Sequence, residues 1–418
     1  MYGMAMSYVS NPRLQRDDLI MENNLDNSIE VELNEDRYSR LRLIPWWDQD
    51  RLKKAKILVV GAGALGNEIL KNLALIGVGH IVIVDLDKIE NSNLSRSILF
   101  RSGDEGRMKA EVAAERIHEI NPDIHVTAIA GNVVTDIGLG LFRWADFIIG
   151  GLDNREARLF LNRACWRTNR PYIDGAIEAL QGFARVFLPP DGACYECTLS
   201  ETDWQLLDKR RSCSLLSRDE MLEGKTPTTP TSASIIAGIE VQEMLKLLHH
   251  SRDLPVLAGK CFVFNGLTHD SYIIEYQKKD DCMSHETYTN IEEMEIGAEN
   301  TTIRTIIELI NARLGSGTVL ELNRDIVSKA QCLCGYSYNH FKPIDALSQG
   351  DGECPECGRL LQLDMFHIID GHEDFIDRSL SSIGVPLFDI LTGRKGDHEI
   401  HFELSADKGR ILKQEANI

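Results

Sequence analysis

The sequence predicts an α/β fold: a Rossmann-like, doubly wound and mostly parallel sheet, followed by a small α+β domain that carries a zinc ribbon. Two observations predict this organisation. Between about residues 36 and 290, short apolar runs alternate with stretches of helical periodicity, which is typical of βαβ units. After residue 290 that alternation stops, and four closely spaced cysteines follow. Residues 1–35 are polar and show no apolar periodicity, so we expect a flexible arm there.

The composition is that of a globular protein, and it argues against a nucleic-acid partner. Hydrophobic residues make up 43% and charged residues 26% of the 418 positions. The net charge of −19 opposes binding to nucleic acid or to an anionic membrane surface. No apolar run approaches the roughly 18 residues that a membrane helix needs, and no secretory signal pattern is visible. We therefore expect a cytoplasmic protein with no membrane contact.

An apolar run that ends in glycine predicts the first strand. Residues 56–60 form this run directly before Gly61, as in a buried parallel strand. The helix that follows has apolar residues at positions 69, 70, 73 and 74, which lie on one helical face. The same alternation continues along the chain. The predicted strands are residues 56–60, 80–85, 125–129 and 147–150, and the predicted helices are residues 67–76, 109–120, 156–168 and 232–248.

Residues 291–418 show a different pattern, which predicts the small α+β domain. An amphipathic helix is expected over residues 301–314, because four isoleucines recur there at helical spacing. The cysteine-rich segment at about 331–362 predicts the zinc ribbon. Further predicted elements are a strand over 318–322, a helix near 374–382 and a strand over 399–404.

A glycine loop after the first strand predicts a nucleotide site. Gly61, Gly63 and Gly66 form the pattern Gly-x-Gly-x-x-Gly at the start of a helix, where backbone amides can approach a phosphate closely. Asp85 ends the second strand nineteen residues beyond Gly66, where a carboxylate can hold ribose hydroxyls. These features alone indicate a nucleotide site, and an NAD-dependent dehydrogenase would be their default interpretation.

Polar residues after the second strand favour ATP over a dinucleotide. The segment from Asp85 to Arg96 also contains Asp87 and Asn93, and Lys109 follows. Arg96 and Lys109 would neutralise the charge that develops on a departing pyrophosphate, a need that a dehydrogenase does not have. Asp153 follows the strand at 147–150, at the edge of the sheet where Mg²⁺ on the phosphates would lie.

These motifs together resemble the ubiquitin-activating enzyme superfamily, which includes the ThiF/MoeB-like adenylyltransferases of thiazole and molybdopterin synthesis. The resemblance covers residues 36–290 and includes the segment Arg37-Tyr38-Ser39-Arg40. It implies adenylation, dependent on ATP and Mg²⁺, of the C-terminal glycine of a small ubiquitin-like protein. It also implies a homodimer, because the chain has a single adenylation unit and Arg40 resembles the arginine that such dimers supply to the partner's ATP.

The resemblance assigns a role to each of these residues. Asp85 would hold the ribose, and Asp87 would belong to the same nucleotide site. Asn93, Arg96 and Lys109 would contact phosphates, and the magnesium ion would be bound by Asp153.

Short cysteine spacings predict two structural zinc sites. A turn can direct two ligands that are close in sequence at one ion, and Cys₃His and Cys₄ sets are both typical of structural zinc. The resemblance implies one such zinc at the end of the adenylation domain, with His285 in place of the usual fourth cysteine. Unligated buried thiols are the alternative for this set. The first set is Cys194, Cys197, Cys282 and His285, and the second is Cys332, Cys334, Cys354 and Cys357.

Cys213 is the candidate nucleophile. It follows three consecutive basic residues, 209–211, which favour the thiolate form, whereas Cys165 and Cys261 lie in apolar patterns typical of core thiols. The resemblance implies that the crossover loop, residues 198–231, carries the cysteine that takes the modifier from AMP as a thioester. Only 28 residues separate Cys197 from Thr226, so the chain resembles the compact members whose cysteine lies on that loop.

The resemblance also implies a role for residues 291–418, as a ubiquitin-fold-like domain that recruits a conjugating enzyme. Removing these residues is then expected to leave adenylation intact. A zinc-ribbon domain that binds some other protein is the alternative for this part. For the whole chain the alternatives are a sulfur-carrier-protein adenylyltransferase without a thioester step, a dinucleotide-dependent oxidoreductase, and a non-catalytic scaffold.

Overall fold

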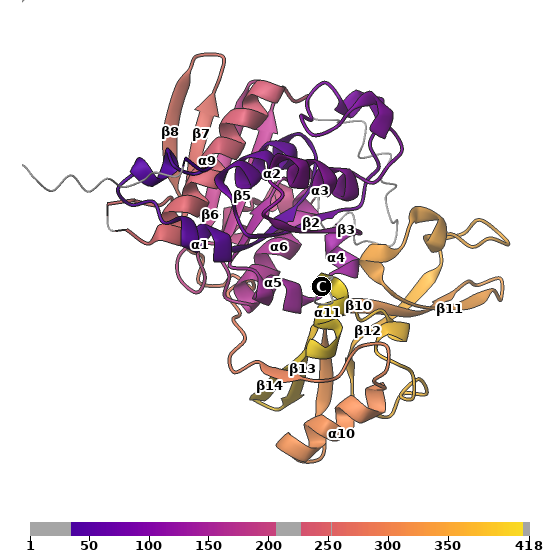
Figure 1. Cartoon of the computed structure of the whole chain (residues 1–418). Helices are drawn as coiled ribbons and strands as arrows, with labels where there is room; N and C mark the ends of the chain where they lie inside the picture. The colour runs from indigo at the N-terminus through magenta and orange to yellow at the C-terminus, as the bar shows by residue number, and fades with distance from the viewer. Residues whose placement is uncertain (1–34, 206–226, 252, 413–418) are drawn as a thin grey trace, which may run out of the picture.

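The computed structural model describes residues 35–205, 227–251 and 253–412 (Figure 1). Its first part is built on an eight-stranded sheet with the order β3-β2-β1-β4-β5-β6-β7-β8. The pairs from β3 to β5 are parallel and the pairs from β5 to β8 are antiparallel, which confirms the predicted Rossmann-like, doubly wound sheet. The strands are β1 Lys56–Val60, β2 His80–Asp85, β3 His125–Ala130, β4 Phe147–Gly150, β5 Tyr172–Glu178, β6 Gln181–Phe187, β7 Lys260–Asn265 and β8 Asp270–Glu275.

Helices cover both faces of this sheet because its central strands are apolar on both sides. Ile57 and Val59 pack into the core under α2, α3 and α9, and Leu58 and Val60 pack into the core under α5 and α6. The helices of this part are α1 Gln49–Lys54, α2 Ala64–Ile76, α3 Lys109–Ile120, α4 Val133–Asp136, α5 Leu139–Trp144, α6 Arg155–Arg167 and α9 Pro230–His249, with the short 3₁₀ helices η1 Leu41–Leu43, η2 Asn91–Asn93, η3 Ser102–Asp104 and η4 Glu196–Thr198.

The order of the strands positions the candidate site. Strand β1 lies between β2 and β4, and the chain leaves β2 and β4 in opposite directions across the sheet. At such a point the loops that follow neighbouring parallel strands diverge and leave a crevice, which is where ligands of this fold class bind. The glycine loop follows β1, Asp85 ends β2, and Asp153 lies in the loop after β4.

The second part is the expected α+β unit. Its six-stranded sheet has the order β11-β10-β13-β14-β9, with β12 also paired to β10, and α10 packs on it through Ile303, Ile306 and Ile310 (Figure 1). Its likeness to a ubiquitin fold stays a prediction. Its elements are β9 Glu292–Met294, α10 Ile303–Leu314, β10 Val319–Gln331, β11 Ser337–Pro343, β12 Gln362–Ile369, β13 Ile390–Lys395, β14 His398–Leu404 and α11 Lys408–Leu412, with η5 Ile344–Ala346, η6 Gln349–Gly352, η7 Ser381–Ile383 and η8 Ser405–Asp407.

The helix predicted near residues 374–382 is wrong. That segment forms turns that end in the 3₁₀ helix η7. Its main chain instead pairs with the start of α10, because the amides of Ile303 and Arg304 donate to the carbonyl oxygens of Arg378 and Ile376. The first amides of a helix have no partner within that helix, so this segment provides the acceptors that α10 lacks.

The two parts share one hydrophobic core. Phe388, Ile390 and Leu412 from the second part belong to the core under α5 and α6. The Gly140 amide donates to the Phe388 carbonyl oxygen at 2.9 Å, and the Leu139 amide donates to the Asp389 carboxylate at 2.8 Å. Removing residues 291–418 would expose that core, so adenylation by such a truncated chain is not expected to survive. No helix among the described residues is long and apolar enough to span a membrane.

Candidate functional site

The glycine loop is closely packed at two of its three glycines. Gly61 has φ of +94°, and a Cβ atom added there would lie 2.5 Å from the Gly151 carbonyl oxygen. A Cβ atom added to Gly66 would lie 1.9 Å from the Gly61 carbonyl oxygen. Both distances are shorter than any tolerable contact, so the loop after β1, the first turn of α2 and the loop after β4 meet only because these positions have no side chain.

Gly63 faces open space and precedes an uncapped helix. Nothing lies within 4 Å of the position that its Cβ would take. Gly63 is the N-cap of α2, and no side chain accepts from the first amides of that helix. Unpaired amides at a helix N-terminus attract anions, and a missing Cβ lets an anion approach the main chain. The residues therefore fit a phosphate group at this position.

Asp85 holds the glycine loop. Its carboxylate accepts from the Ala62 amide at 2.7 Å and from the Asp87 amide at 2.8 Å. Burial raises the pKa of this carboxyl group, and the charge of Lys109 opposes that rise. The structure thus places Asp85 directly beneath the loop, whereas its contact with a ribose stays a prediction.

Lys109 lies at the same edge of the sheet although it begins α3. Its Nζ donates to the Asp87 carboxylate at 2.9 Å, and its amide donates to the Asp87 carbonyl oxygen, also at 2.9 Å. The Lys109 side chain is only 12% exposed. These contacts fix a cation close enough to the glycine loop to act on Asp85. The structure therefore brings Asp85, Asp87 and Lys109 together, as the sequence predicts.

Asn93 and Arg96 make local contacts in the segment after β2. The Asn93 side-chain oxygen accepts from the Glu90 amide at 2.9 Å and so closes the turn at η2. One guanidinium nitrogen of Arg96 donates to the Ser92 carbonyl oxygen at 2.8 Å. These contacts do not join either side chain to the glycine loop. Their roles toward phosphate stay predictions.

Asp153 lies on the loop that follows β4. It is exposed, and Asn154 donates to its carboxylate at 3.3 Å. Asn154 is the N-cap of α6, since its side-chain oxygen accepts from the Ala157 amide at 2.8 Å. Asp153 therefore reaches the same edge of the sheet as the glycine loop, and an exposed carboxylate there fits a magnesium ion.

Arg40 lies far from the glycine loop of its own chain. The neighbouring Tyr38 is in contact with Gly77, which caps the C-terminal end of α2, and its hydroxyl accepts from Asn121 at 2.8 Å. Because α2 spans 13 residues, or about 20 Å, Arg40 is separated from the glycine loop by the length of a helix. The expected role of Arg40 in a partner's site stays a prediction.

Asn67 is a structural member of the site that the sequence interpretation missed. It is 0% exposed. Its amide nitrogen donates to the carbonyl oxygens of Ala62 at 2.7 Å and Gly63 at 3.0 Å, and its oxygen accepts from the Leu99 amide at 2.8 Å. One side chain thus connects the glycine loop to the segment that begins with Asn93. An asparagine within an otherwise apolar helical face was the available signal.

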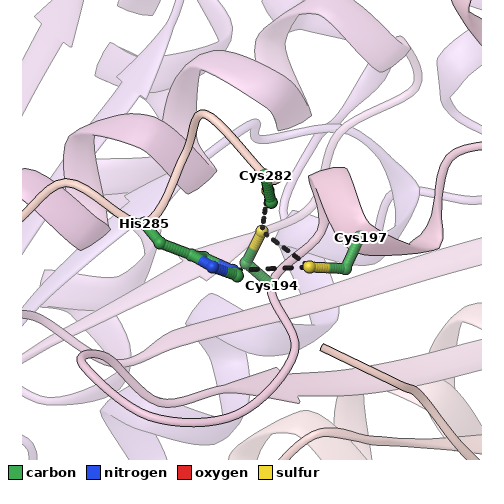
Figure 2. A group of neighbouring side chains, drawn as sticks. All are labelled: Cys194, Cys197, Cys282 and His285. Atoms are coloured by element: carbon green, nitrogen blue, oxygen red, sulfur yellow. Dashed lines mark hydrogen bonds between the residues drawn. The ribbon is translucent and has the colours of Figure 1, made fainter. Parts of the chain in front are cut away.

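The first cysteine set converges as predicted (Figure 2). The Cys194 sulfur lies 3.7 Å from that of Cys197 and 3.5 Å from that of Cys282, and the Cys197 sulfur lies 3.4 Å from Nε2 of His285. Ligands at the usual zinc bond lengths around a tetrahedral ion lie about 3.5–3.8 Å apart. The four residues therefore have the spacing of a zinc site.

Burial favours the neutral forms of the residues in the first set. It raises the pKa of the Cys194 and Cys282 thiols and lowers the pKa of His285. A bound zinc ion would hold the three cysteines of this set as thiolates. The His285 ring also packs against Trp166, with ring centroids 4.4 Å apart and the rings tilted by 33°, and this contact helps to orient it toward the sulfurs.

The second cysteine set lies at the tip of the ribbon. The Cys332 sulfur lies 3.5 Å from that of Cys357, and the Cys334 sulfur lies 3.6 Å from that of Cys354. Gly335 donates to the Cys332 carbonyl oxygen and so forms a tight turn that tolerates the one-residue gap. All four sulfurs lie within 4.8 Å of one another, so these residues also fit a zinc ion.

Cys213 lies outside the described residues, but the described ends of the crossover loop are both anchored near the site. Before the gap, Asp203 forms an ion pair with Arg155 of α6 at 3.1 Å, and Arg155 lies two residues after Asp153 in the sequence. After the gap, the Pro227 carbonyl oxygen accepts from the Ala179 amide at 2.5 Å. The loop therefore leaves from the start of α6 and returns to the turn between β5 and β6.

Curated relatives align with about two fifths of the chain. A sulfur carrier protein adenylyltransferase of Thermus thermophilus is 36% identical over 39% of this chain and 63% of its own length. The SAMP-activating enzyme E1 of Haloferax volcanii is 37% identical over 40% of this chain and 62% of its own length. The NEDD8-activating enzyme E1 catalytic subunit of Caenorhabditis elegans is 40% identical over 37% of this chain and 40% of its own length. The chain thus aligns with less than two thirds of each of these relatives.

Among solved structures, the microcin C7 biosynthetic enzyme MccB, in complex with N-formylated MccA, resembles this chain with a TM-score of 0.50. The alignment covers 60% of this chain and 76% of that one at 23% identity, so it shows likeness of fold alone. The model of the ThiF family matches residues 36–284, more than half of the chain. This match agrees with the glycine loop and with the residues gathered at the edge of the sheet, and the chain therefore belongs to the ThiF family.

Proposed function

We propose that this chain uses Mg·ATP to adenylate the C-terminal carboxylate of a small ubiquitin-like protein. The observation that carries the proposal is the position of Lys109. A lysine from α3 is held by Asp87 beside a glycine loop whose Gly63 faces open space. A dinucleotide needs no such fixed cation at this edge, whereas a triphosphate that loses pyrophosphate does. Relatives named as adenylyltransferases and as activating enzymes support the same interpretation.

The reaction exchanges one phosphoryl bond for another. An oxygen of the modifier's carboxylate attacks the α-phosphorus of ATP, the bond to the bridging oxygen breaks, and pyrophosphate leaves with its electron pair. The amides at the start of α2 would hold phosphate oxygens, and Lys109 would offset the charge that develops on the leaving group. Arg96 would join Lys109 in that role. Magnesium bound near Asp153 would neutralise the triphosphate.

We further propose that Cys213 takes the modifier from the adenylate. Its thiolate attacks the acyl carbon, a thioester forms, and AMP leaves with the electrons of the broken carbon–oxygen bond. Residues 209–211, which are all basic, would favour the thiolate. The ion pair between Asp203 and Arg155 supports the proposal, because it holds the first part of the crossover loop beside the proposed adenylation site.

Further parts of the proposal concern metals, location and partners. Two structural zinc ions would occupy the two cysteine sets, and their thiolates require a reducing compartment such as the cytoplasm. The active unit would be a homodimer in which Arg40 reaches the partner's ATP. Residues 291–418 would recruit a conjugating enzyme to accept the modifier from Cys213.

Two assays with one modifier test these steps. The modifier would be a small protein that ends in glycine and is encoded beside the gene for this chain. Wild-type protein should catalyse ATP–pyrophosphate exchange in its presence and form an adduct that a thiol reductant releases. Cys213→Ala should keep the exchange and lose the adduct. Cys261→Ala, which alters a buried thiol in β7, should keep both.

Other results of the exchange and adduct assays would contradict a particular step of the proposal. An adduct that persists in Cys213→Ala contradicts the assignment of the nucleophile. Exchange without any adduct in the wild-type protein supports the second candidate, a sulfur-carrier-protein adenylyltransferase, which the Thermus relative favours. Binding of NAD in place of ATP, with no exchange, would contradict adenylation itself.

A further inference from the structure

A buried arginine holds the loop that carries Asp153. Arg158 lies on the inner face of α6 and is buried. One of its terminal guanidinium nitrogens donates to the carbonyl oxygens of Leu152, at 2.6 Å, and Gly175, at 3.0 Å. Its Nε donates to the Asp174 carboxylate at 3.0 Å. The guanidinium group therefore joins the residue before Asp153 to the neighbouring strand β5.

Asp174 is itself fixed from three sides. It is 0% exposed. In addition to Arg158, it accepts from the Tyr172 hydroxyl at 3.0 Å and forms an ion pair with Arg185 of β6 at 2.5 Å. A buried carboxylate with this many charged partners is a rigid anchor, because moving it would leave buried charges unpaired. Arg158 is thus held in one orientation by groups that cannot easily shift.

The loop after β4 has little freedom once Arg158 is in place. The Gly151 amide donates to the Val60 carbonyl oxygen at 2.8 Å, and Gly151 packs against Gly61 and Gly66 of the glycine loop. Arg158 adds a hydrogen bond to the next carbonyl, that of Leu152. The main chain is therefore fixed on the side of the glycine loop and on the side of β5, directly before Asp153.

We propose that Arg158, anchored by Asp174, is a positioning residue that aims Asp153 at the metal of bound Mg·ATP. This inference rests on the proposed function, in which Asp153 serves the magnesium ion. The contacts of Arg158 are to the Asp174 carboxylate and to the main chain at Leu152 and Gly175, so its part is to hold the loop. The forked guanidinium is suited to the task because it can grip a carboxylate and two carbonyls at once, which the single ammonium of a lysine cannot.

Binding of ATP with and without Mg²⁺ tests the proposal without knowledge of the modifier. Isothermal titration would measure the affinity of full-length protein for ATP in Mg²⁺ and in EDTA, and the ratio of the two affinities is the readout. Asp153→Asn should lower the ratio, and Arg158→Gln should lower it at least five-fold while the EDTA affinity changes less than two-fold. In Arg158→Gln the Asp174 carboxylate keeps Arg185 and Tyr172, so the variant is expected to fold.

Three comparisons make the readout specific to positioning. The double variant Arg158→Gln with Asp153→Asn should have a ratio of affinities no lower than that of Asp153→Asn alone, because both residues act on the binding of the same magnesium ion. Arg158→Lys keeps the charge beside Asp174 and should show an intermediate ratio. Arg170→Gln is the matched control, because Arg170 also holds a main-chain carbonyl, that of Arg143, but precedes β5 at the opposite edge of the sheet. Its ratio should match that of the wild-type protein.

The outcomes separate this inference from the proposed function. If Arg158→Gln folds and keeps the wild-type ratio, or if its effect adds fully to that of Asp153→Asn, the positioning role is overturned. If Arg158→Gln does not fold, Arg158→Lys decides by the same criterion. Wild-type protein that binds ATP equally well with and without Mg²⁺ would overturn the metal role of Asp153 as well. Wild-type protein that binds no ATP would overturn the proposed function itself.

Discussion

Glu240 offers a test of the buried charges behind the site. It lies on α9 and is 0% exposed, and neither of its carboxyl oxygens has a hydrogen-bond partner among the described residues. A Cβ atom added to Gly175 would lie 2.5 Å from its Oε2 and 2.6 Å from a methyl group of Leu65, so the carboxyl group sits between β5 and α2. Burial, reinforced by the charge of Asp174, raises the pKa of Glu240 far above its ordinary value.

The expected effect of Glu240→Gln follows from the sign of that shift. The folded protein keeps a proton on Glu240 that the unfolded chain loses above its ordinary pKa of 4.5. The free energy of unfolding of the wild-type protein therefore falls, relative to the glutamine variant, by about 1.4 kcal/mol per pH unit until the pH reaches the raised pKa. The advantage of Glu240→Gln should therefore grow with pH from about pH 4.5 upward, and it should level off where Glu240 ionises in the folded protein.

Urea unfolding followed by tryptophan fluorescence at several pH values would measure this difference. Other titrating groups are common to both proteins and cancel in the comparison. Glu243→Gln is the control on the same helix. Glu243 is also buried, but it accepts from the Leu257 amide at 2.8 Å and pairs with Lys246, so its variant should lose stability. If the difference in the free energy of unfolding between Glu240→Gln and the wild-type protein stays constant with pH, then the folded protein does not hold an extra proton on Glu240.

Two further predictions concern the glycine loop and the metal sites. Gly66→Ala should lower the free energy of unfolding by about 3 kcal/mol or more, because its Cβ would meet the Gly61 carbonyl oxygen at 1.9 Å. Gly63→Ala should fold normally and lose affinity for ATP, because nothing lies near the position of its Cβ. Melting curves and titration with ATP would test both variants, and equal melting temperatures for Gly66→Ala and Gly63→Ala would contradict this prediction. Elemental analysis should find two zinc ions per wild-type chain and one in either Cys194→Ser or Cys357→Ser, and an unchanged content in either variant would exclude that cysteine as a ligand.

Local patterns in the sequence determined the framework of the site. The apolar run before Gly61 predicted β1, and the glycine spacing predicted the loop, because both depend on residues that are neighbours along the chain. The convergence of each close cysteine pair could be predicted for the same reason, since the two residues of a pair lie on one short turn. Only the joining of Cys194 and Cys282 needed the resemblance to a family.

The tertiary structure decided which distant groups meet. Nothing local marks that Asn67 contacts Leu99, that Arg158 holds Leu152, or that Phe388 completes the core of the first part. Residues 374–382 do not form the predicted helix, and the carbonyl oxygens of Ile376 and Arg378 instead accept from the first amides of α10, a long-range pairing that the local sequence does not mark. Sequence periodicity reports which face of an element is apolar. It does not report what will cover that face, because packing depends on the arrangement of every element at once.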